Sequence, residues 1–130
     1  MNIGLVAYNS KKDLMANFCI AYRSILEKHQ VYATGSTGRV VEDATNLRIH
    51  KYLSGPLGGL EQLKVHIASN EMDLVLLFHD TEQPELNDSL MQLLTLCDAH
   101  NVPIATNLAT AEMLILGLDS GHLDWRDLYR

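Results

Sequence analysis

The segment MDLVLLF, residues 72–78, decides the fold class because its apolar residues run almost without interruption. A strand that is apolar on both faces is typical of a parallel sheet covered by helices on two sides. Four other short runs have strand-like composition: NIGLVAY (2–8), VYAT (31–34), IHKYL (49–53) and VPIAT (102–106). The pattern predicts five strands, with residues 72–78 at the centre of the sheet.

Segments with apolar residues at helical spacing separate these runs. The predicted helices cover residues 10–30, 39–47, 60–70, 88–100 and 109–118. The segment from Gly35 to Gly38 is expected to break the chain before the second of them. Asp88 or Ser89 is the expected N-cap of the fourth helix, and Asn107 or Thr110 could cap the last, with capping the favoured role of Thr110. Alternating strands and helices predict an α/β fold, a Rossmann-like or flavodoxin-like three-layer domain with a mainly parallel five-stranded sheet.

Composition narrows the class of protein. A length of 130 residues, 47% of them hydrophobic, suits one domain spanning residues 1–130. No apolar run approaches the roughly 20 residues that span a bilayer, and the N-terminus lacks a signal-peptide pattern, so a cytoplasmic protein with no membrane partner is expected. Sixteen acidic against ten basic residues give a net charge of -6, which opposes nucleic-acid binding.

The cysteines and histidines show no metal-ligand spacing. Cys19 and Cys97 lie far apart in apolar segments, which favours buried free thiols over a disulfide. The six histidines are scattered singly, and each is expected to be a surface or structural residue rather than a metal ligand. The sequence therefore predicts no metal site.

Polar loops follow the predicted strands, where ligands bind in a parallel α/β sheet. The loop TGSTG, residues 34–38, combines hydroxyl groups with backbone N–H groups at a helix start, a composition that suits a phosphate. Lys12 opens the first helix at the same sheet edge and could neutralise that charge. The alternatives are a plain capped turn for TGSTG and a solvated side chain for the lysine. The loop SGPLGGLEQ, residues 54–62, adds three glycines, which indicate a tight turn or close backbone approach to a ligand.

Five segments in order resemble the methylglyoxal synthase family, which has relatives in the regulatory domain of carbamoyl phosphate synthetase and in the IMP cyclohydrolase domain. The segments are IGLVAYNSKK, VYATGSTG, LSGPLGG, DLVLLFHD and VPIATNLATAE, within residues 2–116. The resemblance implies a homohexamer that converts dihydroxyacetone phosphate to methylglyoxal and inorganic phosphate without a metal or cofactor.

The resemblance also assigns site residues. The family's phosphate-binding positions fall on Lys12, Thr34, Ser36, Thr37, Ser54 and Gly55. An arginine near the family's C-terminus that contributes to the phosphate region corresponds to Arg130 or Arg126.

The family's acids are largely replaced in this chain. Leu60 stands at the position of the family's catalytic base, an aspartate, and Asn9 replaces a second aspartate. Leu86 and Ser89 align with a histidine and a third aspartate. Asp80 is the one family acid that is retained. A leucine cannot accept the carbon-bound proton whose removal begins the reaction.

Three functions follow from this mixture of retained and replaced residues. The first is a methylglyoxal-synthase-like protein that binds inorganic phosphate or a small, triose-phosphate-like metabolite, with absent or impaired catalysis. The second is an active methylglyoxal synthase with a relocated base, for which the candidates are Glu61, His79, Glu85 and Asp88. The third is an oligomerisation module that uses the tail 121–130, which could pack on its own domain or on a neighbouring subunit.

Overall fold

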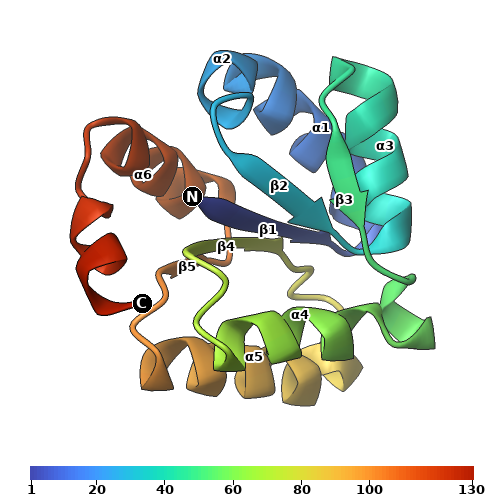
Figure 1. Ribbon diagram of the computed structural model, residues 1–130. Helices are drawn as coiled ribbons and strands as arrows, with labels where there is room; N and C mark the ends of the chain where they lie inside the picture. The colour runs from blue at the N-terminus through green and yellow to red at the C-terminus, as the bar shows by residue number, and fades with distance from the viewer.

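A parallel five-stranded sheet with helices on both faces forms the core of the computed structural model, which describes residues 1–130 (Figure 1). The strands are β1 (Asn2–Ala7), β2 (Gln30–Ala33), β3 (Ile49–Lys51), β4 (Leu74–Phe78) and β5 (Ile104–Ala105). They lie in the order β3-β2-β1-β4-β5, and every neighbouring pair is parallel. The predicted α/β class is confirmed. The prediction that residues 72–78 form the central strand is wrong, because β1 occupies that place.

Helices cover the sheet in two layers. The α-helices are α1 (Lys12–Ala21), α2 (Arg23–Leu26), α3 (Gly35–Thr45), α4 (Gly59–Ala68), α5 (Asn87–Ala99) and α6 (Leu108–Asp119). The 3₁₀ turns are η1 (Asn9–Lys11), η2 (Gly55–Leu57), η3 (Pro84–Leu86) and η4 (Asp124–Tyr129). In Figure 1, α4 and α5 lie below the sheet and the other α-helices lie above it.

Each layer has its own apolar core, because successive side chains of a strand point to opposite faces. Leu5 of β1 belongs to the core beneath α1, α3 and α6, whereas Val6 belongs to the core beneath α4 and α5. All five residues of β4 are buried, as expected for a strand covered on both sides. The apolar run in the sequence therefore reflects this double cover.

The second predicted helix begins four residues earlier than expected. The glycines of TGSTG lie inside α3 rather than breaking the chain before it. A Cβ at Gly35 would lie 3.0 Å from the carbonyl oxygen of Tyr52, and one at Gly38 would lie 2.7 Å from Cγ of Lys51. These glycines therefore let α3 pack closely against β3 and the loop that follows it.

The predicted N-cap of α5 is wrong, and of the two candidates predicted for α6 the structure selects one. Helix α5 follows η3 directly, so its N-cap position is Leu86, and neither Asp88 nor Ser89 caps it. At the start of α6, the Asn107 Oδ1 accepts a hydrogen bond from the N–H of Thr110 at 3.0 Å. Asn107 is the cap, and Thr110 supplies the capped N–H group.

The C-terminal tail packs on its own domain through Asp73. The fully buried Asp73 carboxylate accepts hydrogen bonds from Nε of Arg126 and from the guanidinium of Arg130. It also accepts the Asn2 N–H at 2.8 Å. Burial raises the pKa of Asp73, but these donors outweigh it and the net pKa lies below its ordinary value.

The tail lies at the amino ends of the strands, because Asp73 directly precedes β4. In Figure 1 the C-terminus lies beside the N-terminus, at the edge of the molecule away from the strand arrowheads. Within one chain, Arg126 and Arg130 therefore lie away from the carboxyl ends of the strands, where the phosphate site is expected. Their charge is used to hold the tail in place.

Both cysteines are buried and free, as predicted. Burial raises the pKa of Cys19 to about 12 and that of Cys97 to about 11, so both thiols stay protonated near neutral pH. No helix has the length and apolar character needed to cross a membrane. No three His, Cys, Asp or Glu side chains are grouped in a way that could hold a metal ion.

Candidate functional site

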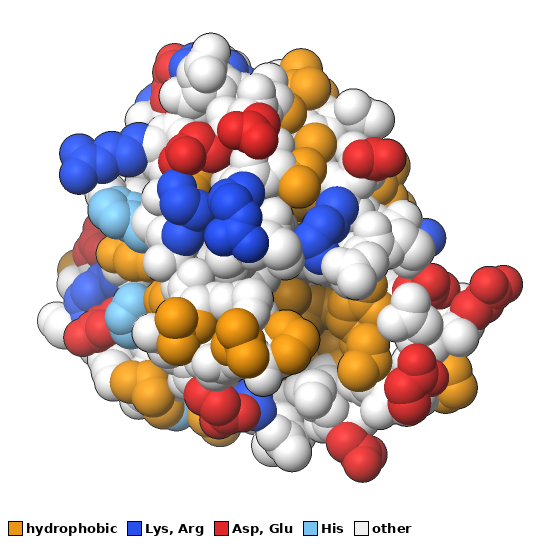
Figure 2. All heavy atoms as spheres, turned by 90° about the vertical axis from the view of Figure 1, so that its right-hand side faces the viewer, with side chains coloured by type: hydrophobic (Ala, Val, Ile, Leu, Met, Phe, Trp, Pro, Cys, Tyr) orange, Lys and Arg blue, Asp and Glu red, His pale blue; other side chains and the backbone are white.

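A pocket of about 390 Å³ opens at the carboxyl ends of β1 and β2, between the two helical layers. Figure 2 looks onto this end of the molecule and shows a hollow with basic side chains gathered above it and hydrophobic side chains around and below it. The lining consists of Val6, Ala7, Tyr8, Asn9, Lys12, Thr34, Ser36, Gly55, Pro56, Leu60, Glu61, Lys64, Gln83, Leu86 and Ser89. This is the sheet edge where ligands of parallel α/β folds bind.

Four of the six predicted phosphate-binding residues come together in this lining: Lys12, Thr34, Ser36 and Gly55. Thr37 lies behind it, where its Oγ1 accepts the N–H of Ala7 at 3.2 Å and ties α3 to β1. Ser54 is also outside the lining, and its carbonyl accepts the N–H groups of Leu57 and Gly59.

The start of α3 offers unpaired donors to the pocket. Thr34 is the N-cap residue, and its side chain makes no capping hydrogen bond. The N–H groups of Ser36 and Thr37 have no backbone acceptor, as is usual in the first turn of a helix. Together with the positive end of the helix dipole, these donors favour an anion beside Ser36.

Lys12 brings a positive charge to the same place. Its Nζ donates to the carbonyl of Ala7 at 3.0 Å and to Oδ1 of Asn9 at 2.7 Å, which leaves a third N–H for a ligand. Both acceptors are uncharged, so no carboxylate neutralises the ammonium group. Partial burial lowers the pKa of Lys12. Asn9 therefore orients the lysine and leaves its charge available to an anion.

The glycines of SGPLGGL have separate roles. A Cβ at Gly59 would lie 2.0 Å from the carbonyl oxygen of Leu53, so only glycine fits there, and Gly58 has a φ of +111°. A Cβ at Gly55 would contact only Cγ of Leu60, at 3.8 Å. Packing within the chain therefore requires the second and third glycines, whereas Gly55 leaves backbone open to the pocket.

Only one carboxylate lines the pocket, that of Glu61. Its Oε1 accepts a hydrogen bond from Nζ of Lys64 at 3.0 Å, and the same Nζ donates to Oε1 of Gln92 at 2.6 Å. Lys64 belongs to no motif that would single it out in the sequence. The available signal is its spacing, because residues three apart on a helix are neighbours, and Lys64 follows Glu61 by three positions.

Asp80, the retained family acid, lies outside the lining. Its carboxylate accepts the Glu82 N–H at 2.9 Å and the Ser10 hydroxyl at 2.7 Å. These bonds lower the pKa of Asp80 and hold it in the loop after β4. His79, Glu85 and Asp88 do not line the pocket either, so among the predicted replacement bases only Glu61 does.

Comparison with known proteins places the chain in a family. Residues 15–106 match the family model described as the MGS-like domain. A protein of Caldicellulosiruptor saccharolyticus named methylglyoxal synthase is 52% identical over 130 residues, covering 98% of this chain and 92% of that protein. The chain belongs to the methylglyoxal synthase family.

Similarity to two further proteins supports this membership. A protein of Listeria welshimeri named methylglyoxal synthase is 52% identical over 132 residues, covering 100% of this chain and 98% of its own length. The crystal structure of methylglyoxal synthase from Elizabethkingia anophelis superposes with a TM-score of 0.82 at 35% identity, over 88% of this chain and 76% of that one. The resemblance inferred from the sequence motifs is confirmed.

Proposed function

We propose that the protein is a methylglyoxal synthase that cleaves a triose-phosphate-like metabolite, dihydroxyacetone phosphate in the first instance, to methylglyoxal and inorganic phosphate. The observation that carries the proposal is one pocket that combines an anion site at Lys12 and Ser36 with the carboxylate of Glu61. The full-length relatives named methylglyoxal synthase support activity better than they support its absence. Of the two phosphate-dependent functions predicted from the sequence, the active enzyme thus has the stronger support.

The anion site would hold the phosphate of the substrate. The free N–H groups at the start of α3 and the third N–H of Lys12 can donate charge-assisted hydrogen bonds to its oxygens. The same donors would stabilise the additional charge that the phosphate acquires as its carbon–oxygen bond breaks. Binding and departure of the phosphate therefore use the same groups.

Glu61 would act as the general base. Its carboxylate takes a proton from the hydroxymethyl carbon beside the ketone, and the electron pair of that carbon–hydrogen bond forms an enediolate. The enediolate collapses and expels phosphate from the other carbon. The enol that remains rearranges to methylglyoxal by losing a proton from oxygen and taking one up on carbon, and this uptake returns the proton that Glu61 removed. No oxidant, metal or cofactor enters this balance.

An assay of the full chain with dihydroxyacetone phosphate tests the proposal. We expect methylglyoxal and inorganic phosphate to appear in equal amounts, at a rate well above that of a protein-free sample. The protein-free sample is essential because this substrate also decomposes without a catalyst. A rate equal to that of the control would contradict the synthase.

Binding without cleavage is the second candidate function. It is favoured by the two leucines, Leu60 and Leu86, which line the pocket at positions where the resemblance places a base and a histidine. A protein of this kind would bind phosphate and leave dihydroxyacetone phosphate intact. Leu60→Asp would then gain activity that the parent chain lacks. Assembly as a homohexamer is proposed for both functions and can be measured by light scattering.

Lys12→Met is expected to weaken the binding of inorganic phosphate by about 10- to 100-fold, because a hydrogen bond to a charged group contributes about 1.5–3 kcal/mol. Isothermal titration calorimetry at fixed ionic strength measures the effect. Lys11→Met is the matched control, since it removes the same charge from the neighbouring residue, which does not line the pocket. Equal weakening in both variants would show a general charge effect and contradict a site at Lys12.

A further inference from the structure

Two lysines line the pocket, and they belong to opposite helical layers. Lys12 opens α1, which lies above the sheet in Figure 1, and Lys64 lies on α4, below it. The proposed function uses Lys12 for the phosphate and gives Lys64 no role. Removal of a proton from the organic part of the substrate creates a second negative charge, on oxygen. The pocket thus has one cation for each of the two charges.

Lys64 is held beside the proposed base and is largely shielded from water. Its Nζ donates to Oε1 of Glu61 at 3.0 Å and to Oε1 of Gln92, on α5, at 2.6 Å. The Lys64 side chain is 16% exposed, whereas that of Glu61 is 74% exposed. An ammonium group has three N–H donors, so one of them remains for a ligand. The lysine therefore brings an oriented positive charge and a free donor to the pocket.

Transfer of the proton to Glu61 moves a negative charge toward this lysine. Oε1 of Glu61 is bonded to Lys64, so the unpartnered Oε2 is the oxygen that takes the proton. The electron pair of the carbon–hydrogen bond forms a carbon–carbon double bond, and a pair of the ketone moves onto its oxygen. That oxygen is two bonds from the carbon that Glu61 must approach to about 3 Å. The new charge therefore arises beside the Glu61–Lys64 pair.

We infer that Lys64 is the electrophile that stabilises the enediolate oxygen. It pairs with the Glu61 carboxylate before the proton transfer and with the enediolate after it, when Glu61 is neutral. The ion pair is exchanged rather than lost, at a place where partial exclusion of water strengthens it. Its new partner exists only once the charge has formed, so the interaction accelerates proton removal more than it tightens substrate binding. This inference rests on the proposed function and names a further catalytic residue for it.

Uncharged donors in the lining have a different use. The hydroxyl groups of Tyr8 and Ser89 and Nδ2 of Asn9 have no hydrogen-bond partner within the chain and can bind the hydroxyl and ketone of dihydroxyacetone phosphate. A hydrogen bond between two charged groups is roughly twice as strong as one between neutral groups. Lys64 therefore gains more than these donors do when the ketone becomes an enediolate.

Lys64→Met tests the inference in turnover of dihydroxyacetone phosphate. We expect kcat to fall about 100- to 1,000-fold, the usual cost of removing one donor to a developing oxyanion, with KM within about threefold. Lys28→Met is the matched control, because Lys28 also forms an ion pair, with Asp119 at 2.7 Å, but does not line the pocket. Its kcat should stay within about twofold of the parent chain. An unchanged kcat in Lys64→Met, or an equal loss in both variants, would overturn the inference.

A binding experiment tests the same contact without turnover. 2-Phosphoglycolate carries a carboxylate near the position of the enediolate, and ethyl phosphate has the same two carbons without that charge. Glu61→Gln supplies the uncharged base of the intermediate. By calorimetry, Glu61→Gln should bind 2-phosphoglycolate about 10- to 100-fold more tightly than ethyl phosphate, the contribution of a hydrogen bond between charged groups. The double variant Glu61→Gln, Lys64→Met should bind the two esters within about threefold of each other.

The outcomes separate the inference from the proposed function. If both esters bind Glu61→Gln equally, or if the preference persists without Lys64, the inference alone is overturned. If neither ester nor inorganic phosphate binds, the anion site of the proposed function fails as well. A preference that depends on Lys64, in a chain that does not turn over dihydroxyacetone phosphate, would contradict the synthase and support Lys64 as the partner of the second charge. Circular dichroism checks that each variant folds, and Lys64→Gln replaces Lys64→Met if it does not.

Discussion

Glu61→Gln is expected to lower the rate of methylglyoxal release by about 100- to 10,000-fold, the usual contribution of a general base. Glutamine has the same shape as glutamate, but its amide oxygen cannot accept the substrate proton at neutral pH. The affinity for inorganic phosphate should change by less than about threefold, because the donors to the phosphate come from Lys12 and α3. Initial rates with dihydroxyacetone phosphate measure the loss of activity, and a titration with inorganic phosphate measures the affinity.

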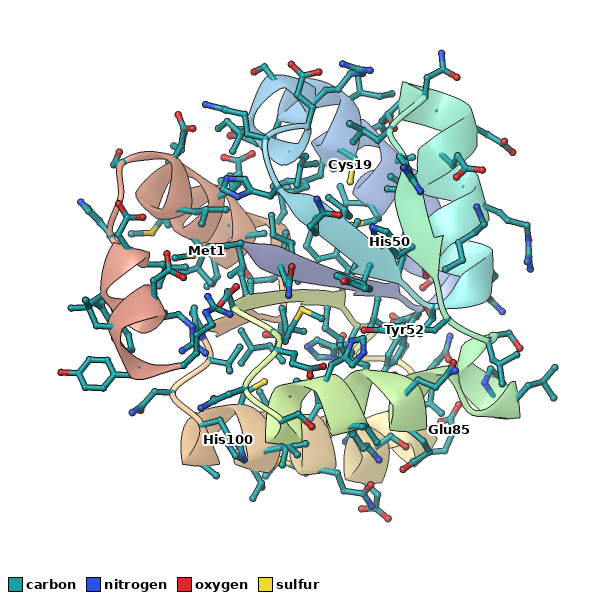
Figure 3. All side chains as sticks on the ribbon, viewed as in Figure 1. Met1, Cys19, His50, Tyr52, Glu85 and His100 are labelled. Carbon is teal, nitrogen blue, oxygen red and sulfur yellow. The ribbon has the colours of Figure 1, made fainter.

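Glu85→Gln is the matched control. Glu85→Gln removes the same charge from η3, which adjoins the pocket. Figure 3 shows Glu85 at the end of the molecule where the pocket opens. Its side chain does not line the pocket, so the rate should stay within about twofold of the parent chain. A similar loss in both variants would point to the summed charge rather than to a base. An unchanged rate in Glu61→Gln would require a different proton acceptor.

The position of Glu61 makes this result informative. It follows Leu60, where the resemblance places the family's base, so its backbone begins one residue further along α4. Its longer side chain could offset part of that shift, and its carboxylate lies on the exposed side of the ion pair with Lys64. Leu60→Asp tests the original position. A rate gain in Leu60→Asp combined with no loss in Glu61→Gln would favour a protein that binds its ligand without cleaving it.

The features that could be predicted from the sequence depend on local patterns. The apolar run of β4 indicated a strand covered on both sides, and the order of the motifs indicated the family, because each is encoded within a few neighbouring residues. The grouping of Lys12, Ser36 and Gly55 followed from the rule that the carboxyl ends of parallel strands meet at one edge.

The features that were missed depend on contacts between distant segments. Asp80 follows β4 as expected, but its carboxylate accepts hydrogen bonds from Ser10 and Glu82 and is held in the loop rather than in the pocket. No spacing in the sequence reveals these contacts. The glycines of α3 resemble a helix break, although they serve close packing against β3. The tail arginines were expected near the phosphate, whereas the buried Asp73 attracts them to the other end of the sheet.

Asp73→Ala is expected to lower the free energy of unfolding by about 3–5 kcal/mol, the usual cost of removing one partner of a buried ion pair. The change leaves the buried guanidinium of Arg126 without its carboxylate, and the Asn2 N–H loses its acceptor. Urea denaturation at pH 7, followed by circular dichroism, measures the loss. Asp127→Ala is the control, because Asp127 also bonds Arg130 but is exposed, and a loss below about 1 kcal/mol is expected there.

The same carboxylate predicts the direction of an acid effect. The folded protein holds the pKa of Asp73 below its ordinary value, so its contribution is fully present above the unfolded pKa of about 3.9 and is lost as the pH falls through the folded pKa. The parent chain should therefore lose stability more steeply below pH 4 than Asp73→Asn, which has no proton to bind there. A carboxylate that anchors the tail must be ionised to do so. The role of this ion network would therefore be contradicted if the stability of the two proteins fell equally steeply below pH 4. Equal stability of Asp73→Ala and Asp127→Ala at pH 7 would contradict it as well.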